Sequence, residues 1–251
     1  MNNKWQITFK ISRQKGNEPR KFEKFKIEVD PDEYVLDGIE RIWAFHDNSL
    51  VFRHACHHST CGACGMLVNG VEKLTCITTI RSVTRNGGTL TIEPLRNFPV
   101  VSDLSVDMGT FYQRMEQANF NQVTTLEEGC LPFEKKKLVP HGEEQSPRLV
   151  DCIECGLCIS ACPAGLTSDS YLGPAVMSAI RDGYAHNCDF SLMQLVDHQD
   201  GVWRCHSAYE CSAVCPSMVD PGWRIMDMRK KIIAYRFSHL FKATTPKRSK
   251  P

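Results

Sequence analysis

The sequence predicts an α+β protein in two parts, a sheet-containing part over residues 1–106 and an all-α part over residues 107–251. Alternating and clustered β-forming residues occur only in the first part. From Asp151 onward the apolar residues follow short helical patterns, separated by cysteine-containing loops. Eleven of the thirteen cysteines fall in three tight groups, one in the first part and two in the second.

Six strands and one helix are expected in the first part. Residues 5–11 and 25–29 form a predicted hairpin around a polar turn at 16–19, and a short strand is expected at 50–52. Residues 66–68 and 71–74 form a second predicted hairpin, closed by Asn69-Gly70, and residues 89–92 follow Gly87-Gly88 as another strand. Between the first hairpin and residue 50, Asp30-Pro31 and Glu33 predict a helix start. Apolar residues then recur at helical spacing at Val35, Leu36, Ile39, Ile42 and Trp43.

The second part begins with a predicted helix over 107–120, whose apolar face carries Met108, Phe111, Tyr112 and Met115. Residues 130–148 contain three prolines and the charge run 134–137, which predicts a solvated loop. From Met228 to Pro251 there are eight Lys or Arg residues and no acidic residue. This stretch is either a solvated basic tail or an amphipathic segment that lies against anionic lipid or an anchor protein.

Composition sets outer limits on function. The 251 residues suffice for two domains, and 42% apolar with 24% charged residues is typical of a globular protein. The net charge of +1 gives no indication of nucleic-acid binding. No apolar run of membrane-spanning length occurs, and the N-terminal residues lack the apolar core of a secretory signal, so a cytoplasmic location is expected.

Thirteen cysteines are an unusual number for such a chain. A disulfide framework is typical of short secreted domains, which this chain does not resemble. Cys130 and Cys188 lie outside the three groups and are expected to be ordinary thiols.

The first group is Cys56-x4-Cys61-x2-Cys64, followed by Cys76. This is the plant-type ferredoxin spacing for a [2Fe–2S] cluster, which needs four thiolates converging on a small volume. Gly62 and Gly65 allow backbone N–H groups to approach sulfur.

Two alternatives to a [2Fe–2S] cluster can be weighed for the first group. A zinc site is an alternative, although zinc ligands usually come in two short paired units. A Rieske centre is another, but no histidine follows the later cysteines. His54, His57 and His58 are therefore expected to be exposed loop residues.

The second group, Cys152-x2-Cys155-x2-Cys158-x3-Cys162-Pro163, is the bacterial ferredoxin run, whose fourth cysteine binds the other cluster of a pair. The third group repeats the spacing at residues 205–216, except that Ala208 replaces the second ligand. Crossing the fourth cysteines predicts a [4Fe–4S] cluster and an incomplete site. The expected ligands of the [4Fe–4S] cluster are Cys152, Cys155, Cys158 and Cys215. Those of the incomplete site are Cys162, Cys205 and Cys211. Three thiolates favour a [3Fe–4S] cluster, with four irons and an open corner as the alternative.

The order of these groups resembles that of the iron–sulfur subunits of succinate dehydrogenases and fumarate reductases. The resemblance extends to residues 102–108, 173–175, 201–203 and 219–221, and residues 121–148 have no clear counterpart. It implies a plant-type, β-grasp ferredoxin-like domain followed by a bacterial-ferredoxin-like (7Fe) domain.

The implied partners are a flavoprotein subunit with covalent FAD and a membrane anchor of the cytochrome b type, with menaquinone or ubiquinone as the electron partner. The implied location is peripheral, at the cytoplasmic face of the inner membrane. By position, Pro163, His206 and Arg229 are implied to contact quinone or the anchor, whereas Thr167 stands where the family has tryptophan.

Three other functions are alternatives to a subunit that relays electrons in such a complex. A freestanding multi-cluster ferredoxin would not need the long helical segments, and a heterodisulfide-reductase-like subunit would usually keep a cysteine at position 208. A zinc-organised interaction protein would hold no iron. The run Cys61–Met66 is nearer to fumarate reductases and His206 is nearer to succinate dehydrogenases. These two signals point in opposite directions, and a menaquinone-linked fumarate reductase is the expectation adopted between them.

Overall fold

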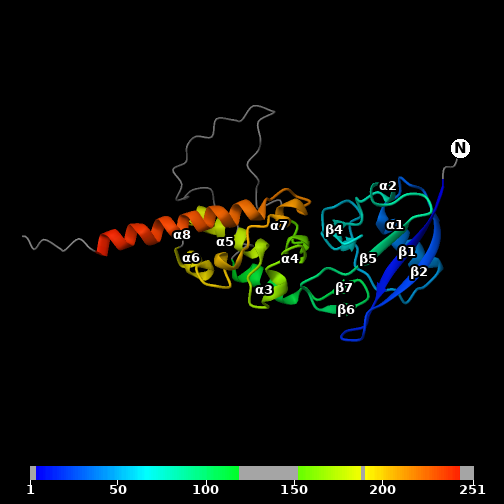
Figure 1. The fold of residues 1–251 in the computed structure, drawn as a ribbon, viewed down its shortest axis with the longest axis horizontal. Coiled ribbons are helices and arrows are strands. Elements are labelled where there is room, and N and C mark those ends of the chain that lie inside the picture. Colours follow the sequence, from blue (N-terminus) through cyan, green and yellow to red (C-terminus); the bar gives the residue numbers. More distant parts are fainter. Residues whose placement is uncertain (1–3, 119–151, 188–189, 244–251) are drawn as a thin grey trace, which may run out of the picture.

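The computed structural model describes residues 4–118, 152–187 and 190–243. A sheet-containing part and a helical part lie end to end along the long axis of the molecule (Figure 1). The loop expected at 130–148, Cys130 and Cys188 lie outside the described residues. Within the described ranges, no helix is both long and apolar enough to cross a membrane.

The first part contains a mixed five-stranded sheet of order β2-β1-β5-β3-β4. The two predicted hairpins are confirmed as antiparallel pairs, and β5 runs parallel to β1 in the centre of the sheet. Asn69 and Gly70 both have positive φ, which the tight turn between β3 and β4 requires. The strand bounds are β1 Trp5–Arg13, β2 Lys21–Val29, β3 Gly65–Val68, β4 Val71–Leu74 and β5 Thr89–Glu93.

Helix α1 (Val35–Phe45) covers one face of this sheet, and a single turn, α2 (Ile80–Val83), lies nearby. The apolar side of α1 is buried against the side chains of β1 and β5. A Cβ at Gly38 would come 2.4 Å from the Phe9 ring, so glycine allows helix and sheet to pack closely. The helix begins later than expected. Asp30 to Glu33 form a turn, and the Asp37 carboxylate accepts the Tyr34 amide at 3.0 Å.

The prediction of a strand at residues 50–52 is wrong. This segment is extended but pairs with a loop: the Val51 amide donates to Asp103 Oδ2 at 2.9 Å, and the Val51 carbonyl accepts the Leu104 amide. Asp103 sits at the turn of a small hairpin that the sequence did not predict, formed by β6 (Val100–Ser102) and β7 (Ser105–Val106). A side-chain carboxylate therefore satisfies the backbone that a neighbouring strand would otherwise have bonded.

The regular elements in the described residues of the second part are all helices or 3-10 turns, as predicted. Helix α3 starts at Gly109 and buries Phe111 and Met115, whereas Tyr112 is partly exposed. The long helix α8 packs along α5, and buried Met177 and Ile180 share one core with Ile225. The bounds are α3 Gly109–Gln117, α4 Leu157–Ser160, α5 Pro174–Asn187, α6 Phe190–Val196, α7 Glu210–Ala213 and α8 Pro221–Ala243, with 3-10 turns at Gly165–Thr167 and Val202–Arg204.

Candidate iron–sulfur centres

The β3–β4 hairpin positions the two buried cysteines of the first group. Cys64 immediately precedes β3 and Cys76 follows β4, so strand pairing brings them together. Thr75 fixes this arrangement, because its amide and its hydroxyl both donate to the Cys64 carbonyl, at 3.2 and 3.0 Å. Cys56 and Cys61 complete the group from the loop that precedes Cys64.

Backbone amides of this loop point at sulfur. Cys56 Sγ accepts N–H groups at 3.3 to 3.5 Å from three residues: His58, Thr60 and Cys61. These contacts, led by the His58 amide, lower the pKa of the Cys56 thiol to about 6. Burial raises the pKa of Cys76 to about 11. Metal coordination deprotonates such a thiol outright, so the pair suits a cationic iron core better than two free thiols.

A second site is a cavity of about 430 Å³ in the helical part. Its lining includes four cysteine side chains from two distant segments: Cys152, Cys155, Cys158 and Cys215. Apolar residues such as Phe111 and Val219 also line the cavity. Burial raises the pKa of Cys155 to about 12 and that of Cys158 well above its ordinary value. Thiols that resist ionisation on their own fit a metal cluster, because the positive charge of the metal stabilises the thiolate forms.

A third site, of about 330 Å³, is lined by three cysteines and by Ala208 in the position where a fourth would stand. The three are Cys162, Cys205 and Cys211. Burial raises the pKa of Cys211 to about 12. The Tyr171 hydroxyl lies 3.9 Å from Cys162 Sγ. Sequence reasoning missed Tyr171, which lies outside every cysteine run and is brought here by the loop before α5.

Two short helices explain why the fourth cysteines cross. Cys158 lies on α4 and Cys162 just after it, while Cys211 lies on α7 and Cys215 just after it. The two helices contact each other between the cavities. Each helix therefore sends one cysteine into each cavity, and Gly156, with φ of 77°, turns the chain into α4.

A polar brace joins α4 to the sheet-containing part. Buried Glu72 on β4 accepts the Ser160 hydroxyl at 2.9 Å, and the same hydroxyl accepts the Arg96 amide at 2.9 Å. The Asn97 side-chain amide donates to the Ile159 and Cys162 carbonyls at the end of α4. These contacts fix the helix that carries Cys158 against the hairpin that carries Cys64 and Cys76.

Of the three residues expected to contact quinone or the anchor, two line the third cavity and one binds backbone carbonyl groups. Pro163 and His206 are exposed and line the third cavity. The Arg229 guanidinium instead holds backbone, because its Nε donates to the Val202 carbonyl at 2.7 Å and its Nη2 to the Cys205 carbonyl. Arg229 therefore supports the loop that positions Cys205.

The fold and the three cysteine sites define an iron–sulfur electron-transfer protein. Residues 8–113 match the family of 2Fe-2S iron-sulfur cluster binding domains, and residues 148–219 match the 4Fe-4S dicluster domain. The chain is 34% identical over 225 residues to the fumarate reductase iron-sulfur subunit of Mycobacterium tuberculosis, covering 81% of this chain and 83% of that one. The corresponding subunit of Haemophilus influenzae is 33% identical over 212 residues, with 79% and 81% covered.

Two further comparisons extend this group. The mitochondrial succinate dehydrogenase [ubiquinone] iron-sulfur subunit 2 of Oryza sativa is 32% identical, with 78% of this chain and 63% of that one covered. A chain of the Mycobacterium smegmatis Sdh1 complex in the apo form has the same fold, with a TM-score of 0.74, 23% identity and 93% and 98% coverage. This chain belongs to the family of fumarate reductase and succinate dehydrogenase iron–sulfur subunits, which carry [2Fe–2S], [4Fe–4S] and [3Fe–4S] clusters.

Proposed function

We propose that this chain relays electrons, one at a time, between covalent FAD in a flavoprotein subunit and a quinone at a membrane anchor subunit of the cytochrome b type. The complex is a quinol:fumarate reductase or succinate dehydrogenase. The run Cys61–Met66 is nearer to fumarate reductases and His206 to succinate dehydrogenases, and of the two we propose a menaquinone-linked fumarate reductase. The observation that carries the proposal is the continuous contact among the three cysteine sites.

The ligand assignment follows the cavities. Four residues hold the [2Fe–2S] cluster: Cys56, Cys61, Cys64 and Cys76. Four hold the [4Fe–4S] cluster: Cys152, Cys155, Cys158 and Cys215. Three hold the [3Fe–4S] cluster: Cys162, Cys205 and Cys211. When bound, these clusters each accept and release single electrons, which suits a relay between two-electron partners.

The polypeptide packs between neighbouring cysteine sites and so separates them from solvent. Gly62 of the first loop packs on Cys155, and α4 and α7 lie between the second and third cavities. The first loop is exposed at Cys61, where the flavoprotein would dock. His206 is exposed at the third cavity, where quinone would approach.

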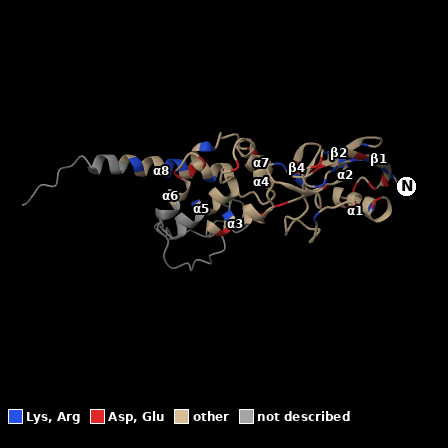
Figure 2. Ribbon diagram, turned by 90° about the horizontal axis from the view of Figure 1, so that it is seen from below, with Lys and Arg blue, Asp and Glu red and all other residues tan. Residues whose placement is uncertain are grey.

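Helix α8 supports docking of the helical part at a membrane-bound partner. Basic residues are spaced along it (Figure 2), and between them Ile233, Tyr235 and Phe237 are exposed. Exposed aromatic residues beside lysine and arginine suit the boundary between headgroups and an anchor protein. We place this surface at the cytoplasmic face of the inner membrane.

The finer fold assignment belongs to the same proposal. Central parallel strands β1 and β5, with α1 across the sheet, support a β-grasp, plant-type ferredoxin-like domain. The paired helices α4 and α7 support a bacterial-ferredoxin-like domain. We place the boundary after Val106, where β7 ends.

The purified membrane complex tests the function. Co-migration with a flavoprotein is expected in gel filtration, whereas a freestanding ferredoxin would elute alone. His206→Ala is expected to lower the rate of fumarate reduction at least about tenfold when a menaquinol analogue is the electron donor. The rate with a reduced viologen dye as donor should stay unchanged, because the dye bypasses the quinone. His198→Ala, which changes an exposed histidine outside the third cavity, is the matched control. Equal loss with both electron donors would contradict the placement of quinone.

A further inference from the structure

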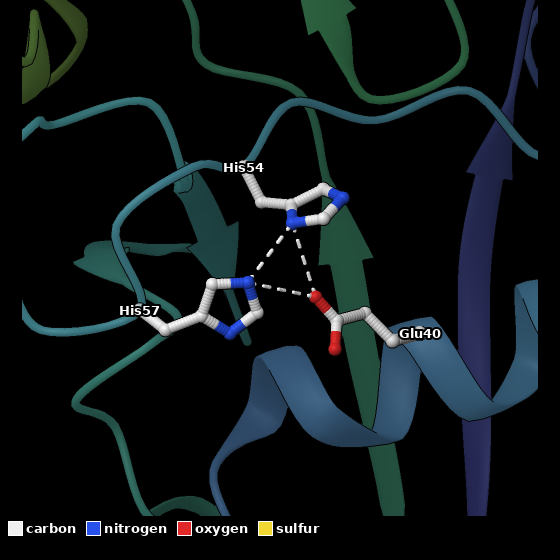
Figure 3. Close-up of side chains that lie close together, drawn as sticks. All are labelled: Glu40, His54 and His57. Carbon is white, nitrogen blue, oxygen red and sulfur yellow. Dashed lines mark hydrogen bonds and ion pairs between the residues drawn. The ribbon is translucent and has the colours of Figure 1, made fainter.

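Three side chains outside the cysteine sites converge at the surface of the first part (Figure 3). Glu40 projects from α1, and His54 and His57 project from the loop around Cys56. Glu40 Oε1 lies 3.1 Å from His54 Nδ1 and 3.3 Å from His57 Nε2. The two ring nitrogens are 3.1 Å apart. One oxygen and two nitrogens therefore form a nearly equilateral triangle.

Hydrogen bonds cannot satisfy all three sides of this triangle. If both rings donate to the carboxylate, two N–H groups face each other across the third side. If one ring donates to the other, a nitrogen lone pair faces the carboxylate oxygen. Each nitrogen carries at most one proton and a carboxylate oxygen carries only lone pairs, so one repulsive contact always remains. A cation between the three atoms removes that repulsion, because every lone pair then points at it.

The dimensions match a transition-metal ion. Bonds of about 2.0–2.2 Å at angles between octahedral and tetrahedral place neighbouring ligand atoms about 2.8–3.6 Å apart. All three observed distances fall in this range. An ion at such bond lengths would sit about 1 Å out of the plane of the triangle. The ligand side chains are 30 to 43% exposed, which leaves room for water on the open side.

The surrounding structure holds the ligands in place. The His54 ring stacks on Phe52, with centroids 5.1 Å apart. Glu40 follows buried Ile39 on α1, which anchors the helix to the sheet. Although the residue is partly exposed, Glu40 Oε1 itself is shielded from solvent and makes no hydrogen bond of acceptable geometry within the described residues. A shielded carboxylate oxygen without a hydrogen-bond partner is costly, and a cation bound between it and the two imidazoles would remove that cost.

We propose that Glu40, His54 and His57 bind one divalent transition-metal ion, for which Zn²⁺ is the best match. Two imidazoles and one carboxylate are common ligands of this ion, and the site uses none of the proposed cluster ligands. The ion would add positive charge beside the loop that contains Cys56. Such a charge favours the more negative, reduced state of a neighbouring cluster.

The test uses the intact, cluster-loaded complex with Zn²⁺ as the probe. After equilibrium dialysis, zinc, iron and sulfide are measured together, so that zinc in cysteine sites that have lost iron is recognised. We expect one zinc per chain at full iron content. In Glu40→Gln and His57→Ala the zinc affinity should fall about tenfold or more, because a ligand is lost. His58→Ala removes an adjacent exposed histidine outside the triangle and should bind zinc normally.

X-ray absorption at the zinc edge supplies a second measurement. Only nitrogen and oxygen neighbours at about 2.0–2.2 Å are expected. Sulfur neighbours would overturn the proposal, because the zinc would then be bound by cysteine. Equal zinc binding by wild type and Glu40→Gln at equal iron content would also overturn it, as would loss of zinc in His58→Ala.

Discussion

Gly62 and Cys155 lie in direct contact across the junction between the two parts of the molecule. A Cβ added to Gly62 would come 2.7 Å from Cys155 Cβ and 2.9 Å from the Ile153 carbonyl oxygen. Real Cβ atoms essentially never approach so closely, and the nearest Cys155 atoms are backbone or next to it. The loop of the first site can therefore rest on the loop of the second only if residue 62 has no side chain.

Gly62→Ala should separate these loops. Its φ is +69°, so alanine adds backbone strain as well as the clash. Gly87→Ala is the matched control, because Gly87 has a φ of +76° and open space around it. We expect G62A to destabilise the protein by about 1–3 kcal/mol more than G87A, since overpacking adds to the common strain. Thermal unfolding of the two cluster-loaded variants measures the difference, and equal melting temperatures would contradict the contact.

Ser160→Ala should weaken the brace between the two parts. The substitution removes the hydroxyl that donates to buried Glu72 and accepts the Arg96 amide. Loss of this hydrogen bond to the buried carboxylate should lower the free energy of unfolding by about 1–3 kcal/mol. Each kcal/mol should lower the melting temperature by about 2–4 °C. Ser82→Ala, at an exposed serine that bonds only a local carbonyl, should change the melting temperature far less. If both variants melt alike, the brace makes no net contribution.

Ala208→Cys should convert the third site. Ala208 lines the cavity that holds three cysteines, so a thiol there supplies the missing ligand. We expect the EPR signal of an oxidised [3Fe–4S] cluster to disappear and the iron content to rise by about one atom per chain. Ala213→Cys adds a thiol at an exposed position on α7 that does not line the cavity and should leave the signal unchanged. Persistence of the signal in A208C would contradict the placement of residue 208.

Removal of iron should expose a difference in thiol reactivity. The pKa of Cys56 is lowered to about 6, so above pH 6 this thiol is largely ionised, whereas Cys76, with a pKa raised to about 11, stays protonated at pH 7. The thiolate is the reactive form. Iodoacetamide at pH 7 should therefore label Cys56 before Cys76, and its rate at Cys56 should fall as the pH drops through about 6. Peptide mass spectrometry measures both, and uniform labelling would contradict the amide contacts at Cys56 Sγ.

The sequence by itself determined the division into a sheet-containing and a helical part and the grouping of the cysteines. Both hairpins were predictable, because alternating β-formers flank turn residues such as Asn69-Gly70. The crossing of the fourth cysteines could also be predicted, because the fourth cysteine of a bacterial ferredoxin run binds the other cluster of the pair. These features depend on local spacing, which the chain carries in its residue order.

Only the tertiary structure decided contacts between segments distant in sequence. The extended segment at 50–52 pairs with Asp103 rather than with a strand, and Tyr171 reaches Cys162 through the packing of α5. The role of Arg229 in holding the loop at Cys205 likewise depends on where α8 lies. The triangle of Glu40, His54 and His57 joins a helix to a loop by packing alone. Neither periodicity nor spacing in the sequence predicts these contacts, because each depends on how helices, strands and loops pack against a shared core.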